Sequence, residues 1–328
     1  MPGSTLIQFV HEGKAAYPEL RAMQDYFAER GYETTEVRPD GVFQDRARKT
    51  VCWHMMGFYP RRLDCTVSIH DYRSLSVGRL ARTKDRLKRL LNARPDIRIF
   101  QNQDIRQALG FIEDDQTRYL PMGVPQPFIE QRGPAARPAV DFIYIGSMLA
   151  ERRCELMLDS FLKRFGDTSS FDLYGPPNDQ LVARYSAHSN IRFRGTVAQA
   201  QLPAILCKAR VGVCYFPMHY PHLLQTPTKL MEYAALGMRI LANDHPQSRI
   251  TAQQYGLECA WGSNGDMFEA IPAALDWPDN MAVDPRPMEW NAVISASGVE
   301  QALAQALDRT KPPPATDASA GPHSYSQA

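Results

Sequence analysis

Two successive series of strand and helix patterns set the strongest limit on how this chain folds. In the first series, short apolar runs such as Thr5–Val10 alternate with amphipathic stretches such as Glu19–Arg30. The alternation starts afresh at Val140–Ile145 and continues to Ile240–Ala242. Between the two series, Ile129–Ala139 is rich in Pro, Ala and Arg and lacks periodicity, which is typical of a linker. Strands that alternate with helices predict parallel sheets with helices on both faces.

The pattern predicts two α/β domains followed by a helical segment and a tail. We expect the first domain in residues 1–130, the second in 131–288, a helical segment that returns toward the first domain in 289–309, and a disordered tail in 310–328, which is small, polar and proline-rich. Further strands are expected at Tyr32–Val37, Lys49–Met56, Cys65–His70, Ile97–Asn102, Arg118–Pro121, Phe171–Tyr174, Ile191–Phe193 and Val211–Phe216, and further helices at Arg79–Asn92, Cys154–Phe165, Leu202–Lys208, Lys229–Leu236 and Gly298–Leu307.

Composition and charge exclude several classes of protein. The 328 residues carry a formal net charge of +1, so no global field attracts nucleic acid, and we expect no nucleic-acid partner. No apolar run approaches the roughly 18 residues that a membrane-spanning helix needs. The six cysteines form no C-x-x-C pair and most lie in apolar runs. This usage indicates reduced, buried cysteines and a cytoplasmic location.

The most informative motif is Thr228-Lys229-Leu230-Met231-Glu232, which opens a predicted helix. Lys229 and Glu232 are three residues apart and therefore share one helix face near its N-terminus. This end of a helix favours anions, so a lysine there suits a phosphate, and the carboxylate one turn further suits a pair of ribose hydroxyls. The alternative is a weak ion pair on a solvated face. Gly146 and Gly175 each follow a predicted strand, where a backbone can approach a ligand closely.

The order of these features resembles the group 1 glycosyltransferases, family 4, which have the GT-B fold: two Rossmann-like domains that face each other across a cleft. The segments that carry the resemblance are Phe142–Ser147 followed by Glu151-Arg152, then Asn190–Gly195, and above all Thr228–Gly237. The resemblance implies an enzyme of bacterial polysaccharide or glycan biosynthesis.

The resemblance also implies roles for individual residues. Arg152 stands where the family has a basic residue that contacts the donor diphosphate, and Glu232 stands where a glutamate accepts hydrogen bonds from the ribose. The chain departs from the family at Leu224, because many members have a glutamate eight positions before the one matched by Glu232. From these matches, and from the glycines that follow predicted strands, we expect Gly146, Arg152, Gly175, Thr228, Lys229 and Glu232 to bind the donor.

In the first domain, Val67–Arg73 reads as an apolar strand that ends in polar residues. The family often has a histidine near the end of this strand, close to the reacting sugar. We therefore nominate His70 for a role in catalysis, with Asp71 as the second choice; the alternative is that both cap the strand end. Gly13, in a predicted cleft loop after the first strand, is a further donor-binding candidate.

The implied reaction moves a sugar from a nucleotide-diphosphate sugar to a glycan, polysaccharide or lipid-linked acceptor, with retention as the family-level expectation. Departure of the diphosphate needs positive charge, for which Arg152 and Lys229 are the catalytic candidates. We expect no cofactor and no metal site, because there is no Asp-x-Asp motif and no third ligand of suitable spacing near His219 and His222. The alternative is a sugar-nucleotide epimerase on the same scaffold. A dehydrogenase is disfavoured because no G-x-G-x-x-G follows the first strand of either domain.

A second informative segment is the basic stretch Arg79–Arg94, which holds seven Lys or Arg and one Asp. Its leucines, Leu80, Leu87, Leu90 and Leu91, fall on roughly one helical face. Such a helix can rest on anionic lipid at the inner face of a membrane. The alternative is a helix whose leucines face the core and whose basic side is solvated. The sequence leaves both open.

Overall fold

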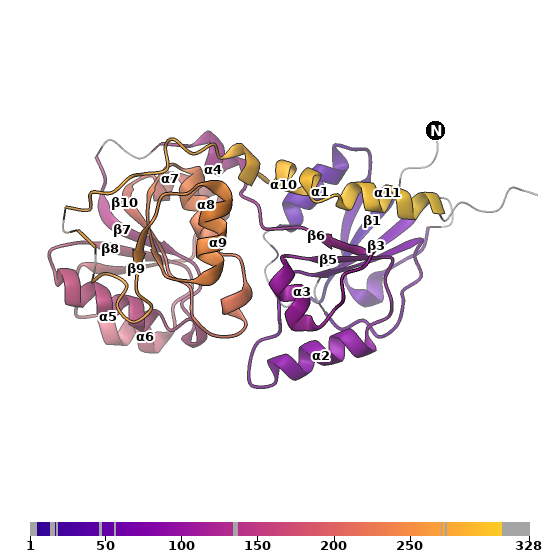
Figure 1. Cartoon of the computed structure of the whole chain (residues 1–328), viewed down its shortest axis with the longest axis horizontal. Helices are drawn as coiled ribbons and strands as arrows, with labels where there is room; N and C mark the ends of the chain where they lie inside the picture. The colour runs from indigo at the N-terminus through magenta and orange to yellow at the C-terminus, as the bar shows by residue number, and fades with distance from the viewer. Residues whose placement is uncertain are drawn as a thin grey trace, which may run out of the picture.

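The computed structural model describes residues 5–13, 17, 19–45, 48–55, 57–133, 137–269, 271–272 and 274–309. These residues form two lobes, each built around a six-stranded sheet (Figure 1). All strand pairs within both sheets are parallel. The predicted α/β class is therefore confirmed, whereas the predicted tail at 310–328 lies outside the described residues.

The first sheet has the strand order β2-β1-β3-β4-β5-β6. Its strands are β1 (Leu6–Val10), β2 (Glu33–Val37), β3 (Thr50–Met55), β4 (Val67–Tyr72), β5 (Ile97–Phe100) and β6 (Thr117–Tyr119), and its lobe contains the helices α1 (Leu20–Ala28), α2 (Ala81–Leu91) and α3 (Gln103–Leu109) and the turn η1 (Pro39–Gly41). One expectation was wrong: β4 does not end at His70 but continues through Asp71 and Tyr72. His70 therefore lies inside the strand.

The second sheet has the strand order β12-β11-β10-β7-β8-β9. Its strands are β7 (Val140–Ile145), β8 (Phe171–Tyr174), β9 (Ile191–Gly195), β10 (Ala209–Cys214), β11 (Arg239–Asn243) and β12 (Ala260–Gly262). The helices of this lobe are α4 (Gln126–Glu130), α5 (Cys154–Phe165), α6 (Asp179–Tyr185), α7 (Leu202–Leu206), α8 (Thr228–Ala235) and α9 (Pro246–Tyr255), and its short 3-10 turns are η2 (Ala150–Arg152), η3 (Gln199–Gln201) and η4 (His222–Leu224). Apolar clusters cover both faces of this sheet, which explains why its strands read as continuous apolar runs.

The chain crosses between the lobes twice, and the two crossings lie side by side. Val124 pairs with Glu289, and the Val124 amide donates to the Met288 carbonyl oxygen at 2.8 Å. After η5 (Arg286–Met288), the helices α10 (Trp290–Ala296) and α11 (Val299–Arg309) return to the first lobe (Figure 1). Trp290 and Leu303 join its main core with β1, β3 and α1.

Away from the crossings, the segment around η4 of the second lobe meets the first lobe. The Asn102 side chain donates to the Leu224 carbonyl oxygen at 2.9 Å, and the Thr226 amide donates to the Gln101 side-chain oxygen at 2.9 Å. The Tyr220 hydroxyl also donates to Asp85 of α2. These contacts fix the chain just before α8 against the first lobe.

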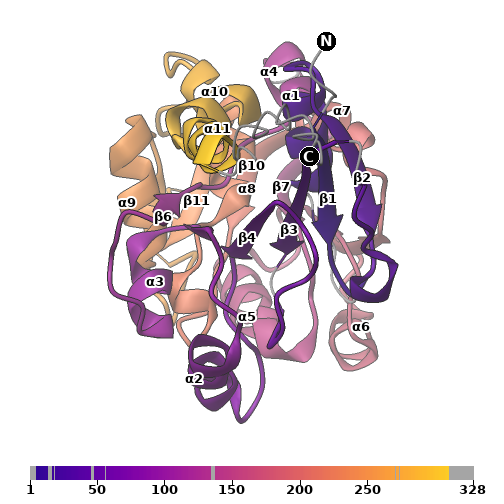
Figure 2. The same cartoon turned by 90° about the vertical axis from the view of Figure 1, so that its right-hand side faces the viewer.

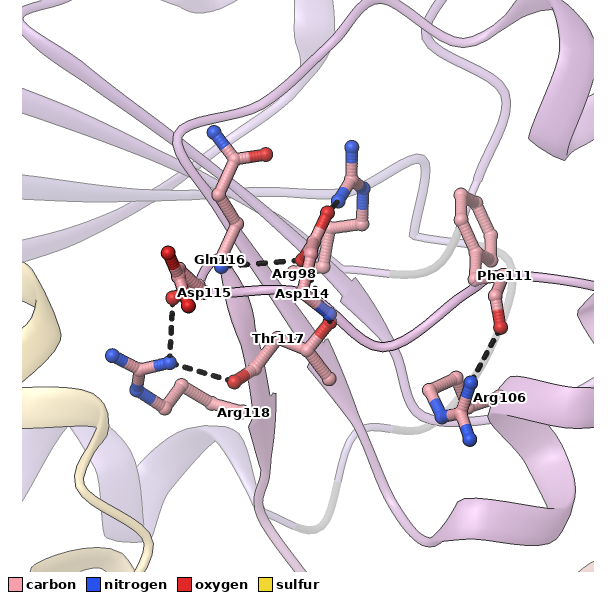
Figure 3. A network of polar contacts seen from close by, with 8 residues as sticks. All are labelled: Arg98, Arg106, Phe111, Asp114, Asp115, Gln116, Thr117 and Arg118. Carbon is pink, nitrogen blue, oxygen red and sulfur yellow. Dashed lines mark hydrogen bonds and ion pairs between the residues drawn. The ribbon is translucent and has the colours of Figure 1, made fainter.

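Polar contacts also fix the turn before β6 in the first lobe (Figure 3). Arg98 of β5 donates to the Asp114 carboxylate at 2.6 Å, and the same carboxylate accepts from the Thr117 hydroxyl at 2.9 Å. Arg106 of α3 donates to the Phe111 carbonyl oxygen at 2.6 Å.

Among the described residues, no helix combines the length and apolar character that crossing a membrane requires.

Candidate active site

The candidate site lies where the strand order of the second sheet reverses. From β7 the chain adds β8 and β9 on one side, and from β10 it adds β11 and β12 on the other, yet β7 and β10 are neighbours. Loops that leave the carboxyl ends of two such strands diverge, and ligands bind in the crevice between them. Gly146 follows β7, and Phe216 lies two residues beyond the end of β10.

Lys229 is a buried cation at this point. It is the second residue of α8, and only 9% of its surface is exposed. Its ammonium lies 4.8 Å from the centroid of the Tyr144 ring and 5.2 Å from that of Phe216. Burial, helped by the charge of Arg152, lowers the pKa of Lys229 to about 8. Within the described ranges Lys229 forms no ion pair, so this cation lacks a counter-ion.

Arg152 brings a second cation to the same aromatic ring. It ends the short turn η2, and its guanidinium carbon lies 5.5 Å from the centroid of Phe216. Its Nη1 atom is buried and has no hydrogen-bond partner in the part of the chain that the structure describes. A buried donor without an acceptor is costly, so an arginine in this state indicates a site for an anion.

Two glycines shape the strand ends beside these cations, for different reasons. A Cβ atom on Gly146 would lie 2.5 Å from the Cε of Lys229, so any residue other than glycine would displace the lysine side chain. Gly175 was expected to admit a ligand, but a Cβ there would lie 2.1 Å from the carbonyl oxygen of Gly146. Both residues have φ angles near +130°, where side chains are strained. Gly175 is thus explained by the approach of two backbones.

Glu232 lies one turn after Lys229 on α8, as the motif predicts, and Thr228 opens the helix. The Glu232 side chain is half-buried, and burial raises its pKa to about 7, while the charge of Lys229 acts to lower it. It forms no ion pair with another described residue. A carboxylate in this setting is free to accept hydrogen bonds from a bound molecule.

The nominated residues of the first lobe, His70 and Asp71, point to opposite faces of β4, because successive strand residues alternate. The His70 ring is buried edge-on against His54, with centroids 4.9 Å apart, and its Nδ1 lies 3.1 Å from the Tyr72 hydroxyl. Burial, helped by the neighbouring His54, lowers the pKa of His70 to about 3, so the ring is neutral at pH 7.

Asp71 belongs to an internal ion-pair cluster of the first lobe. Its carboxylate accepts from the Trp53 indole nitrogen and from the Arg73 Nε, each at 3.2 Å. Arg73 also lies 3.7 Å from Glu19, and all three charged residues are buried. These contacts indicate a structural role for Asp71.

Gly13 follows β1 in an exposed turn, where its amide donates to the His11 ring at 3.1 Å.

Sequence reasoning gave no site role to three residues around the two cations: Phe216, His222 and His245. The His222 Nδ1 lies 3.1 Å from the Gln225 side-chain oxygen, while its buried Nε2 has no partner among the described residues. His245 lies with its ring 5.4 Å from Phe216, and burial lowers the pKa of both histidines to about 4. The sequence gives no signal for this grouping, because only the fold brings His222 and His245 to Phe216.

No grouping of three His, Cys, Asp or Glu side chains suited to a metal ion occurs in the described part of the chain. All six cysteines are free thiols.

Comparison with known proteins identifies the fold. No protein-family model matches the chain, and no curated protein matches it in sequence. Solved structures do match over nearly the whole chain. Sucrose-phosphate synthase from Thermosynechococcus elongatus is 13% identical, with 93% of this chain and 97% of that one covered and a TM-score of 0.58. AviGT4, a glycosyltransferase involved in avilamycin A biosynthesis, is 14% identical, with 93% and 98% covered and a TM-score of 0.58.

A third match is Anabaena HepE, whose structure was solved in complex with UDP and glucose. It is 10% identical, with 93% of both chains covered and a TM-score of 0.57. At such low identities the likeness establishes the architecture, so the predicted GT-B fold of two Rossmann-like domains is confirmed.

Proposed function

We propose that this GT-B chain is a glycosyltransferase that moves a sugar from a nucleotide-diphosphate sugar to a glycan, polysaccharide or lipid-linked acceptor. The observation that carries the proposal is the pair of cations, Lys229 and Arg152, on one aromatic ring at the switch point of the second sheet. Neither forms an ion pair with a described residue. A buried ammonium and a half-buried guanidinium, neither with a counter-ion among the described residues, fit a ligand with two adjacent negative groups, such as a diphosphate.

The reaction breaks the bond between the anomeric carbon and the oxygen of the β-phosphate, and the electron pair leaves with the diphosphate. The acceptor hydroxyl forms the new bond to the anomeric carbon and loses its proton. Charge thus develops on the diphosphate as the bond breaks, and cations held at a water-poor site stabilise that charge more than water does. Arg152 and Lys229 are therefore the catalytic residues in this proposal, and the positive charge they supply makes a divalent metal unnecessary.

The remaining donor contacts follow from the geometry of α8. Glu232 accepts hydrogen bonds from the ribose hydroxyls, which contributes to binding more than to turnover. Thr228 and the Gly146 turn border the diphosphate. In the first lobe, the family resemblance implies that the neutral His70 acts close to the reacting sugar, whereas Asp71 holds Arg73 in place. Retention of anomeric configuration rests on the family resemblance alone, and proton NMR of the first-formed product tests it.

Binding and product analysis test the proposal separately. We expect one nucleoside diphosphate among UDP, GDP, TDP and ADP to raise the melting temperature, since a ligand selective for the native state stabilises it by mass action. Arg152→Ala and Lys229→Ala each lose this shift, while Arg184→Ala, which removes an exposed arginine on α6, keeps it. If the Arg152 and Lys229 variants bind as well as the parent, the site assignment is wrong.

A labelled sugar nucleotide incubated without acceptor separates this reading from the epimerase alternative. An epimerase changes the sugar while it stays attached to the nucleotide, whereas a transferase releases the nucleoside diphosphate and does so faster when an acceptor is present. Conversion of the sugar while it is still attached to the nucleotide would refute the transferase proposal in favour of an epimerase. The proposal also includes a cytoplasmic location, at the inner face of a membrane where lipid-linked acceptors lie.

A further inference from the structure

The helix α2 turns its leucines away from the protein core. The residues of α2 that are buried are Ala81 and Asp85. The leucines of the stretch remain exposed, with Leu80 at 64%, Leu90 at 70% and Leu91 at 51%. Leu80, Leu87 and Leu91 are spaced by seven and four residues, so they lie along one face of the helix. The alternative that these leucines pack against the core is therefore excluded.

The charges of α2 are arranged in a similar way. Lys84 and Arg86 of α2, and Arg79 just before the helix, are exposed, and none forms an ion pair with another residue in the described ranges. The one acid of the stretch, Asp85, faces inward, where it accepts from the Ser76 amide at 3.0 Å and from Lys88 at 3.3 Å. The outward surface of α2 therefore combines leucines with cations and carries no carboxylate of its own.

Neighbouring segments extend this apolar surface. Val77, in the turn before α2, is 59% exposed, and Ile112, after α3, is 83% exposed. Arg89 of α2 lies within 2.8 Å of where a Cβ on Gly110 would be, so the turn that carries Ile112 adjoins the helix. In both overall views α2 forms an outer edge of the first lobe, far from α10 and α11 (Figures 1 and 2).

We propose that this α2 surface, made of Val77, Leu80, Leu87, Leu90, Leu91, Ile112 and the surrounding cations, docks on an anionic lipid bilayer. Leucines that enter the acyl boundary while Lys and Arg contact acidic headgroups are the two attractions that hold a helix on such a membrane. A second copy of the chain fits this surface less well, because a symmetric pairing would place like charges against each other.

Docking would also bring the segment around Tyr220 of the second lobe close to the lipid surface. The Asp85 carboxylate of α2 accepts from Tyr220 of the second lobe, and the Arg82 guanidinium lies 5.3 Å from the Tyr220 ring. The segment that leads into Lys229 therefore rests on the inner side of the docking helix. The inference rests on the proposed function in one respect only, namely that the membrane supplies the lipid-linked acceptor.

Vesicle flotation of the full chain tests the proposal. We expect it to float with vesicles of phosphatidylcholine and phosphatidylglycerol in equal parts at low salt, and to dissociate at high salt or from phosphatidylcholine alone. The double variant Leu87→Glu/Leu90→Glu changes side chains that are already exposed, and we expect its vesicle binding to fall about tenfold or more. The control Ile250→Glu alters a half-exposed apolar residue of α9 and binds like the parent.

Two results would overturn the inference. One is a parent chain that stays unbound with anionic vesicles at low salt. The other is a double variant that floats as the parent does. Self-association of the parent that Leu87→Glu/Leu90→Glu abolishes, without vesicle binding, would assign the surface to a second copy instead. Nucleoside diphosphate binding by the parent and by the same variants is measured in parallel. A parent that binds no nucleoside diphosphate would refute the proposed function and would leave the membrane result intact.

Discussion

The depressed pKa of Lys229 makes diphosphate binding depend on pH in a defined direction. In the free protein the pKa is about 8, so the ammonium is about nine-tenths protonated at pH 7 and about one-tenth protonated at pH 9. A bound diphosphate returns the pKa toward its ordinary value of 10.5, and the lysine then stays charged throughout this range. Binding therefore takes up a proton above pH 8, and the dissociation constant rises about tenfold from pH 7 to pH 9.

Isothermal titration with UDP, or with whichever nucleoside diphosphate the screen selects, measures this change. The groups that act on Lys229 are Arg152, Glu232, Cys154 and Cys214. The two thiols titrate above this range, at about 11 for Cys154 and about 12 for Cys214. Glu232 has a pKa of about 7, so its ionisation affects only the lower end of the range.

Lys229→Met is the matched control because it is uncharged at every pH. If the diphosphate restores the lysine pKa fully, the uncharged form binds about 300-fold more weakly, and the Met variant should show this loss at pH 7 with no further change between pH 8 and pH 9. A parent whose affinity is flat over this range, or a Met variant with the same tenfold change, would refute the reasoning.

Three further predictions concern neighbouring positions. Gly146→Ala strains a backbone with φ near +133° and crowds Lys229, so we expect it to lower the free energy of unfolding by about 1–3 kcal/mol in urea titrations and to weaken binding of the selected nucleoside diphosphate. Gly166→Ala, which also has positive φ but meets no neighbouring atom, should keep that affinity. Glu232→Ala should raise the Michaelis constant for the donor and leave turnover nearly unchanged in steady-state assays. Asp71→Ala leaves Arg73 buried beside Glu19 with its closest counter-ion gone, and should cost about 3–5 kcal/mol in urea unfolding while the folded fraction still binds the selected nucleoside diphosphate.

The sequence was sufficient to predict the parallel sheets, because strands buried on both faces read as apolar runs whatever their neighbours are. It also placed Lys229 and Glu232 on one helix face, since a spacing of three residues is a local property. The strand β4 ran two residues further than expected, because the polar groups of the two extra residues, Asp71 and Tyr72, are buried in pairs with Trp53 and His70 that the sequence does not reveal. The helix α9 was missed for a similar reason: its buried residues include Gln247 and Ser248.

Other features depend on contacts between distant segments. That Arg152 and Lys229 meet at the Phe216 ring follows from the order of strands, which no single motif encodes. The backbone approach that requires Gly175 is likewise a contact between two strand ends. For α2, the amphipathic pattern was visible, but a pattern does not say which side of a helix meets the core. The structure decided this by burying Asp85 and leaving the leucines exposed.

A crystal structure of the protein with the nucleoside diphosphate that the screen selects tests the central claim most directly. The account predicts the diphosphate at the carboxyl ends of β7 and β10, with its oxygens at hydrogen-bond distance, about 3 Å, from both the Arg152 guanidinium and the Lys229 ammonium. The ribose should meet Glu232. A diphosphate bound elsewhere, with both cations still without a counter-ion, would contradict the account.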